Sequence, residues 1–121
     1  MRIEYSLRKI RNTRYKSYRF MGSIFGANCI LKEDDGRYIV PKEAYCTVFS
    51  AFRDIDETKN IEDILEGIYY DLQDSNLVNG MEYFAESGST SDIISIRELG
   101  QKNEKHYFVD SFGFKEIEFE E

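Results

Sequence analysis

Side chains that could act as nucleophiles, general bases or metal ligands are few in this sequence, apart from its carboxylates. His106 is the single histidine, and Cys29 and Cys46 are the two cysteines among 121 residues. A Ser-His-Asp or Cys-His site needs a histidine beside a nucleophile, yet the sequence contains no nucleophile elbow or catalytic-cysteine motif. With 23 acidic residues in the chain, some pair will always resemble an acid–base couple. We therefore expect a strand histidine and a protein that is not an enzyme.

Metal and cofactor binding have no motif either. The two cysteines and the histidine lack the CxxC or HxxxH spacing of zinc sites. The glycine-containing stretch 21–27 is neither a GxGxxG nor a Walker sequence. We expect no metal and no cofactor, and we interpret Gly22 and Gly26 as bulge or bend positions within a strand.

Charge is distributed unevenly along the chain. The net charge is −7, yet residues 1–19 hold seven cations and one acid, whereas the other 102 residues hold nine cations and 22 acids. The chain therefore combines a basic N-terminal segment with an acidic body. An acidic body repels nucleic acid and membrane surfaces and attracts basic protein surfaces. We expect a protein partner with a basic surface and no membrane partner.

Length and cysteine content indicate the domain count and the compartment. A chain of 121 residues has the size of a single domain, 1–121, and can bury a core. It has two thiols in apolar surroundings, no signal peptide and no apolar run of about 18 residues. We expect free, buried cysteines and a cytoplasmic protein, in the host cell if the chain is phage-encoded. The oligomeric state stays open.

The stretch 61–74 is the clearest predicted element, an amphipathic helix that organises the fold. Asn60 is placed to cap its N-terminus. Its other face carries five acids without a Lys or Arg in the helix to pair with them, and Tyr70 lies among them. The apolar stripe, at helical spacing, consists of Ile61, Ile64, Leu65, Ile68 and Leu72.

The first half of the chain otherwise alternates between strand and turn patterns. Residues 1–10 alternate apolar and polar side chains, as a half-buried strand does. Asp35-Gly36 separates two apolar runs and predicts a β-hairpin over 29–40. The apolar residues of 42–54 share one helical face, which favours a helix there.

Strand patterns return after the helical middle. They occur around 92–99 and 106–110, and a C-terminal strand follows with its glutamates pointing outward. Strands at both ends of the chain therefore flank a helical centre. This order predicts an α+β fold with a mainly antiparallel sheet and two consecutive helices, about 42–54 and 61–74, packed on one face.

Acidic residues gather in blocks at the hairpin tip, in the loop before the helix 61–74, on that helix and along the C-terminal strand. Alternating glutamates on a strand lie about 6.5–7 Å apart, close to the spacing of phosphates along a nucleic-acid strand. Such a row can occupy a basic channel, although charged edge strands also prevent aggregation. The candidate protein-binding residues are Glu62, Asp63, Glu66, Tyr70, Asp74, Glu116, Glu118 and Glu120.

These features predict a small, acidic, non-enzymatic inhibitor that binds a basic nucleic-acid-handling protein and blocks its nucleic-acid site. The analogy, in composition alone, is with phage anti-defence proteins such as anti-CRISPR inhibitors. An immunity protein that neutralises a nuclease toxin would use the same physics, so both roles stay open.

The basic N-terminal segment leaves another alternative, a small RNA- or DNA-binding module. Cations interleaved with tyrosines suit phosphate contacts and base stacking. The same cations could instead balance acids of the chain's own body, on a strand pair whose second strand starts near Tyr15. The candidate nucleic-acid-binding residues are Arg8, Arg11, Arg14, Tyr15, Lys16 and Arg19.

Overall fold

The structure is a computed structural model of the chain, and it describes residues 1–73, 77–78, 81–82 and 87–121. Its strands are β1 (Arg2–Ile10), β2 (Lys32–Asp34), β3 (Arg37–Pro41), β4 (Tyr45–Asp54), β5 (Leu77–Val78), β6 (Met81–Glu82), β7 (Ile93–Glu98), β8 (Lys105–Val109) and β9 (Phe114–Glu120). Its helices are the α-helix α1 (Ile61–Asp71) and the 3-10 helices η1 (Thr13–Tyr18), η2 (Ser23–Asn28) and η3 (Lys42–Ala44).

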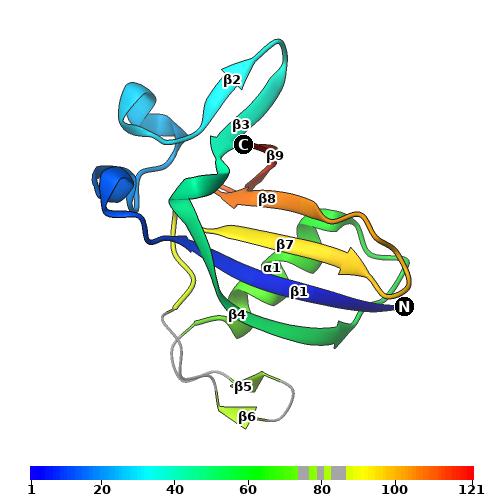
Figure 1. Ribbon diagram of the computed structural model, residues 1–121. Helices are drawn as coiled ribbons and strands as arrows, with labels where there is room; N and C mark the ends of the chain where they lie inside the picture. The colour runs from blue at the N-terminus through cyan, green and yellow to red at the C-terminus, as the bar shows by residue number, and fades with distance from the viewer. Residues whose placement is uncertain (74–76, 79–80, 83–86) are drawn as a thin grey trace.

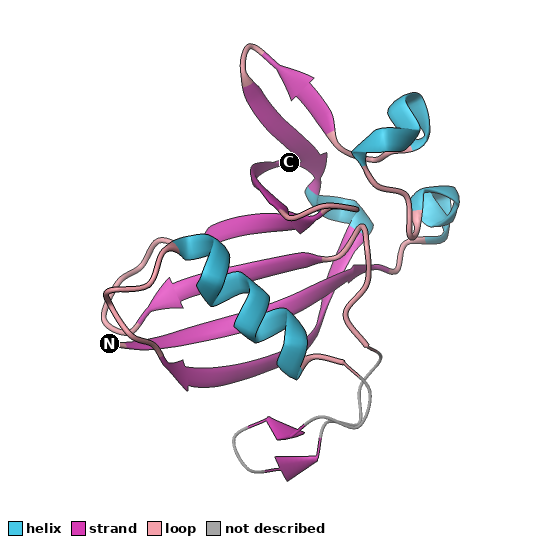
Figure 2. Cartoon of the chain, turned by 180° about the vertical axis from the view of Figure 1, so that it is seen from behind, coloured by secondary structure: helices cyan, strands magenta, loops and turns pink. Residues whose placement is uncertain are grey.

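Among the described residues, seven strands form one sheet in the order β2-β3-β9-β8-β7-β1-β4, and β5 pairs with β6. Neighbouring strands of the large sheet are antiparallel except β3 and β9, which run parallel. α1 lies across one face of this sheet, and η1 and η2 project from one end (Figure 1 and Figure 2). The predicted α+β class is confirmed. None of the described helices is long and apolar enough to cross a membrane.

β1 is the strand on which the main core is built. Ile3, Tyr5 and Leu7 are almost fully buried and belong to the same core cluster as the apolar side of α1. β1 pairs with β4 along one edge and with β7 along the other. The alternation of apolar and polar residues that predicted this strand therefore reflects one covered face of the sheet.

α1 confirms the predicted helix over Ile61–Asp71, while Asp74 lies outside the described residues. Asn60 caps it, because its side-chain Oδ1 accepts a hydrogen bond from Asp63 N at 2.9 Å. Burial of the apolar stripe holds the helix on the sheet. The fully covered members of that stripe are Leu65, Ile68 and Leu72.

The predicted helix over 42–54 is wrong, because this segment is η3 followed by the edge strand β4. A β-bulge explains the misleading pattern. Val48 is inserted between the two residues that pair with Leu7 and Arg8. Val48 and its neighbour Phe49 both pack against the core, so two successive inward residues break the alternation and imitate helical spacing. One face of the sheet is therefore covered by α1 without the expected second helix.

The expected strand near Tyr15 and the expected strand bends at the two glycines are also wrong. Asn12 caps η1 by accepting a hydrogen bond from Arg14 N at 3.0 Å, and Gly26, with φ of 57°, lies inside η2. The Asn12 side chain satisfies a backbone N–H at the start of η1, and Gly26 supplies a positive φ inside η2, so both segments form short helical turns in place of a second strand. A second core lies at this end of the sheet, formed by Ile10, Cys29, Ile30, Val40, Ala44, Tyr45, Ile93, Phe108 and Ile117.

The predicted hairpin is confirmed in β2 and β3. Asp35 and Gly36 have φ angles of 51° and 78°, the left-handed pair that a two-residue type I′ turn requires. β3 then pairs with β9, which brings the hairpin beside the C-terminal strand.

The two cysteines differ in their surroundings. Cys29 is buried in the second core, as expected, whereas Cys46 is exposed on the edge strand β4, contrary to expectation. Both thiols are free.

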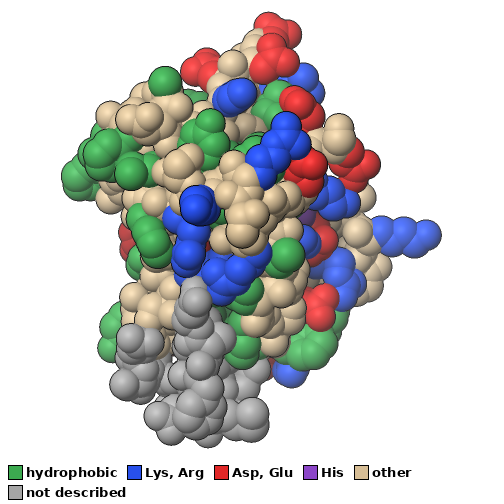
Figure 3. All heavy atoms as spheres, turned by 60° about the vertical axis from the view of Figure 1, so that its left-hand side comes forward, with side chains coloured by type: hydrophobic (Ala, Val, Ile, Leu, Met, Phe, Trp, Pro, Cys, Tyr) green, Lys and Arg blue, Asp and Glu red, His purple; other side chains and the backbone are tan. Residues whose placement is uncertain are grey.

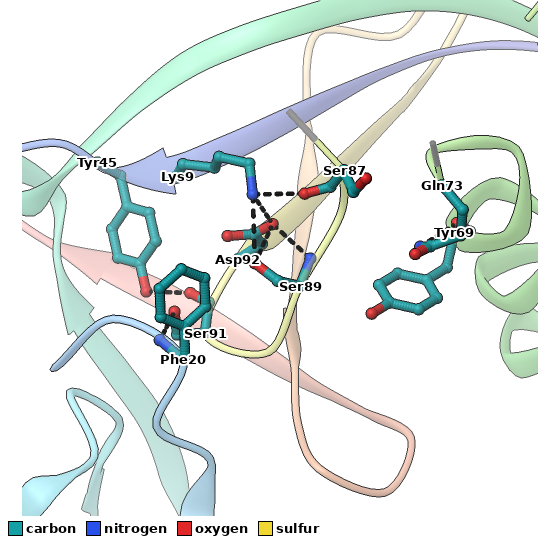
Figure 4. Close-up of polar contacts among 9 residues, drawn as sticks. All are labelled: Lys9, Phe20, Tyr45, Tyr69, Gln73, Ser87, Ser89, Ser91 and Asp92. Carbon is teal, nitrogen blue, oxygen red and sulfur yellow. Dashed lines mark hydrogen bonds and ion pairs between the residues drawn. The ribbon is translucent and has the colours of Figure 1, made fainter. Parts of the chain in front are cut away.

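A buried ion pair ties the end of β1 to the loop before β7. Lys9 Nζ lies 2.7 Å from Asp92 Oδ2, and the two side chains are 3% and 4% exposed. Lys9 also donates to Ser87 O at 2.7 Å, and Ser89 N donates to the same Asp92 oxygen at 2.8 Å (Figure 4). Burial raises the pKa of Asp92, although the bond to Lys9 opposes this effect.

Breaking this pair should destabilise the protein strongly. Lys9→Met leaves a buried carboxylate without its cation, and we expect it to lower the free energy of unfolding by about 3–5 kcal/mol. The double variant Lys9→Met/Asp92→Asn should lose less than Lys9→Met, because it removes the uncompensated charge. Urea unfolding of the three proteins at neutral pH measures the difference. Equal losses in the single and double variants would contradict the buried-charge argument.

Candidate functional site

The predicted acidic face of α1 is exposed in the structure. Glu62, Asp63 and Glu66 are exposed, and Tyr70 retains 70% of its accessible surface. Asp71, by contrast, pairs with Arg53 from the neighbouring strand β4. The sheet therefore supplies the cation, Arg53, that pairs with Asp71 of the helix.

The glutamates of β9 are exposed but do not form one continuous acidic row. Glu118 pairs with Arg37 of the hairpin at 3.0 Å. Glu116 lines a hollow beside the start of α1, whereas Glu120 lines a different hollow beside the hairpin. The hairpin arginine thus neutralises the middle of the three glutamates, and the outer two line different hollows.

A groove of about 840 Å³ lies between the hairpin β2–β3, η1 and the end of β9. We call it the hairpin groove. Its volume is within the usual range for ligand sites. Its apolar lining consists of Tyr15, Tyr18, Ile30, Ile39, Val40 and Pro41, and its charged lining consists of Lys32, Glu33, Asp34, Lys42, Glu43, Glu120 and Glu121.

The floor of the hairpin groove is formed by residues of the second core. Ile30 and Val40 are buried in that core, and Tyr15 and Tyr18 pack against it. The Tyr15 hydroxyl donates a hydrogen bond to Glu43, and this bond raises the pKa of Tyr15. The ring of Tyr15 is therefore held in place along the groove wall.

Carboxylates outnumber cations around the hairpin groove. Five acids and two lysines line it. Lys42 pairs with Glu121 at 2.9 Å, and Arg14, outside the lining, lies 3.7 Å from Glu43. Glu33, Asp34 and Glu120 add further negative charge. The groove consequently favours a cationic ligand with an apolar side chain for the floor.

Two of the four acidic blocks seen in the sequence meet in this groove. The hairpin block supplies Glu33 and Asp34, and the C-terminal block supplies Glu120, because β3 and β9 pair side by side. The acids of α1 do not line the groove. Sequence reasoning missed Tyr18 and Glu43, which carry no local motif and reach the groove only through η1 and η3.

The predicted nucleic-acid-binding residues are partly engaged within the protein. Arg8 Nε donates to Ser95 Oγ at 3.0 Å, and its guanidinium lies 3.5 Å from Glu104. Arg14 is near Glu43, as described above, and Tyr15 bonds to the same carboxylate. Of the predicted set, Arg14, Tyr15 and Lys16 lie together on η1. Arg11 and Arg19 lie just before and just after that helix. These contacts favour the interpretation that the basic segment balances the acids of the body.

His106 lies beside a serine, which the sequence could not show. Its Nδ1 is 2.6 Å from Ser95 Oγ across the β7–β8 pair, and Ser95 also accepts the bond from Arg8. Ser95 has no exposed surface, so a substrate cannot reach its hydroxyl. The three side chains connect β1, β7 and β8. Burial lowers the pKa of His106, which favours the neutral imidazole, and an unprotonated Nδ1 accepts a hydrogen bond from the Ser95 hydroxyl.

A family model described as a YodL-like domain matches residues 9–119 of the chain. No curated protein and no solved structure matches the chain.

His106 should make stability depend on pH. Its folded pKa is lower than its ordinary value of 6.5, so its contribution is complete above about 6.5 and is lost as pH falls through the folded pKa. His106→Gln should flatten this dependence, because no other histidine is present in the chain. Urea unfolding at pH values from about 7.5 to about 5 tests this. Identical slopes for the wild type and the variant would contradict it.

Proposed function

The chain belongs to the YodL-like domain family, and we propose that it is a small, non-enzymatic interaction protein that binds a basic protein in the hairpin groove. The observation that carries this proposal is the convergence of five carboxylates, from the hairpin, η3 and the C-terminal end, around an apolar floor. Separate segments of the chain thus supply one acidic surface.

The chemistry of the groove defines the segment that would fit it. Lysine or arginine side chains would pair with Glu33, Asp34 and Glu120 at the rim. An apolar side chain between them would cover Ile39 and Pro41, and Tyr15 and Tyr18 would supply aromatic contacts, which often dominate interface energies. The charges would give specificity and fast association, and the apolar contact would give most of the affinity.

The class of partner that we propose is a basic nucleic-acid-handling protein, whose nucleic-acid site this chain would block. The hairpin acids Glu33 and Asp34 and the β9 residue Glu120 lie around the same groove, while Glu118 of β9 is paired with Arg37. Carboxylates spaced along a strand can stand in for phosphates in a basic channel. A nuclease toxin would be such a partner, and the chain would then act as an immunity protein.

Charge reversal tests whether the groove or the helix binds. Glu33→Lys/Asp34→Lys and Glu62→Lys/Glu66→Lys change the net charge equally, and all four positions are exposed. Binding of a fluorescent peptide of alternating lysine and leucine should weaken about tenfold or more in the groove variant. The helix variant should bind nearly as the wild type does, and thermal unfolding should confirm that both variants are folded.

The same two variants also serve as baits for partner capture. A partner of this site is a basic protein that the wild type and the helix variant retain and the groove variant loses. If the helix variant loses both peptide and partner while the groove variant keeps them, the site is the α1 face. If neither reversal weakens binding, the proposal of an acidic binding surface is wrong.

Direct nucleic-acid binding gives a separate test. Because Arg8 and Arg14 lie against acids of the chain and the net charge is −7, we expect no mobility shift of single- or double-stranded nucleic acid at low salt. A shift that disappears in Arg11→Gln/Lys16→Gln would support the alternative function of an RNA- or DNA-binding module.

A further inference from the structure

Arg14 places a guanidinium group against two residues of the hairpin groove. Its Cζ lies 5.7 Å from the centre of the Tyr15 ring, and its Nη1 lies 3.7 Å from Glu43 Oε1. Tyr15 and Glu43 line the groove, whereas Arg14 does not. We call the Tyr15 ring and the Glu43 carboxylate the Tyr15–Glu43 site. An aromatic face beside a carboxylate is an arrangement that guanidinium groups favour.

The Tyr15–Glu43 site is held together by its own contacts, independently of Arg14. The Tyr15 hydroxyl donates a hydrogen bond to the Glu43 carboxylate. The Tyr15 ring lies 6.4 Å from the Tyr18 ring, and both rings pack against the second core. Glu43 belongs to η3, and its backbone carbonyl accepts a hydrogen bond from the Asn12 side chain at 3.3 Å. The ring and the carboxylate are therefore in position before a ligand arrives.

Arg14, by contrast, is held loosely. Its side chain keeps 75% of its accessible surface, and that of Glu43 keeps 58%. Ion pairs this exposed contribute little to stability because both charges stay hydrated. Arg8 has a similar arrangement, with the Phe119 ring at 5.4 Å and Glu104 at 3.5 Å, but its side chain is only 19% exposed. Of these two arginines, Arg14 is the one that a ligand can displace.

The charge around the Tyr15–Glu43 site favours a further cation. On the face that carries η1, Lys and Arg side chains lie beside apolar ones, and carboxylates gather toward the hairpin at the top of the view (Figure 3). The five carboxylates of the groove lining outnumber its two lysines and Arg14 together. A cationic segment therefore enters a groove that keeps a negative balance even with Arg14 in place.

We propose that the basic partner bound in the hairpin groove places an arginine on the Tyr15–Glu43 site and displaces Arg14, which occupies this site in the free protein. The inference rests on the proposed function, because it names the side chain by which a partner of that groove is recognised. Arginine fits better than lysine because its planar guanidinium stacks on a ring and offers two parallel N–H donors to a carboxylate. Arg14 then lowers the affinity for every cationic segment, and it lowers the affinity most for segments that carry arginine.

Two variants and two peptides test this assignment. Arg14→Gln vacates the site, and Lys16→Gln is the matched control, since it removes the same charge from η1 at an exposed residue outside the groove lining. Each protein is titrated with fluorescent peptides of equal length that alternate leucine with arginine or with lysine. Arg14→Gln should bind both peptides more tightly than the wild type. It should also raise the preference for the arginine peptide about two- to fivefold, the size of one exposed cation–π contact. Lys16→Gln should keep the wild-type preference.

The ratio of the two affinities separates displacement from simple removal of charge. If Arg14 acts by its charge alone, Arg14→Gln strengthens binding of both peptides equally, and the proposal is overturned. The variant Arg14→Gln/Tyr15→Leu, checked for folding by thermal unfolding, should lose the added preference, and a preference that survives there also overturns it. Peptide binding that depends on Glu33 and Asp34 but not on Arg14 removes this inference and leaves the groove as the binding site. If the wild type and the variants bind neither peptide, both proposals fail.

Discussion

The buried ion pair between Lys9 and Asp92 is the constraint on which one end of this structure depends. A charge buried this completely is tolerated only when its partner and further hydrogen bonds surround it. Lys9 meets this condition by binding Asp92 and the loop before β7 at once. That loop presents Ser91, which in turn receives the amide of Phe20 and the hydroxyl of Tyr45. The ion pair therefore fixes the loop whose Ser91 binds the segment between η1 and η2 and the Tyr45 side chain.

The uneven charge of the chain has a structural explanation that affects its surface. Cations of the N-terminal segment contact acids far along the sequence, as Arg8 does with Glu104 and Arg2 with Asp54. Within the described residues, the exposed groups left at the hairpin groove are mainly carboxylates. The acidic surface therefore lies where carboxylates are not paired with cations of the N-terminal segment or of the other strands. This is why overall net charge is a poor guide to where a partner would bind.

The hairpin groove and the exposed apolar residues of η2 are held by different contacts. The groove is supported by Ile30 and Val40 of the second core, whereas η2 is tied to the turn after β8 by the bonds from Ser23 to Asp110. Because each surface is fixed by its own contacts, a substitution in one should leave the other intact.

The sequence by itself determined the elements whose signals are local. Asn60 and the stripe around Leu65 specify α1, Asp35-Gly36 specifies the hairpin turn, and the alternation around Tyr5 specifies β1, because caps, turn conformations and side-chain periods act within a few residues. Tertiary structure alone decided the rest. The bulge at Val48 converts an apparent helix into β4, Lys9 is buried by a residue 83 positions away, and the parallel pairing of β3 with β9 joins Glu120 to the hairpin acids. Each of these depends on contacts between distant segments, which residue spacing along one strand or helix does not encode.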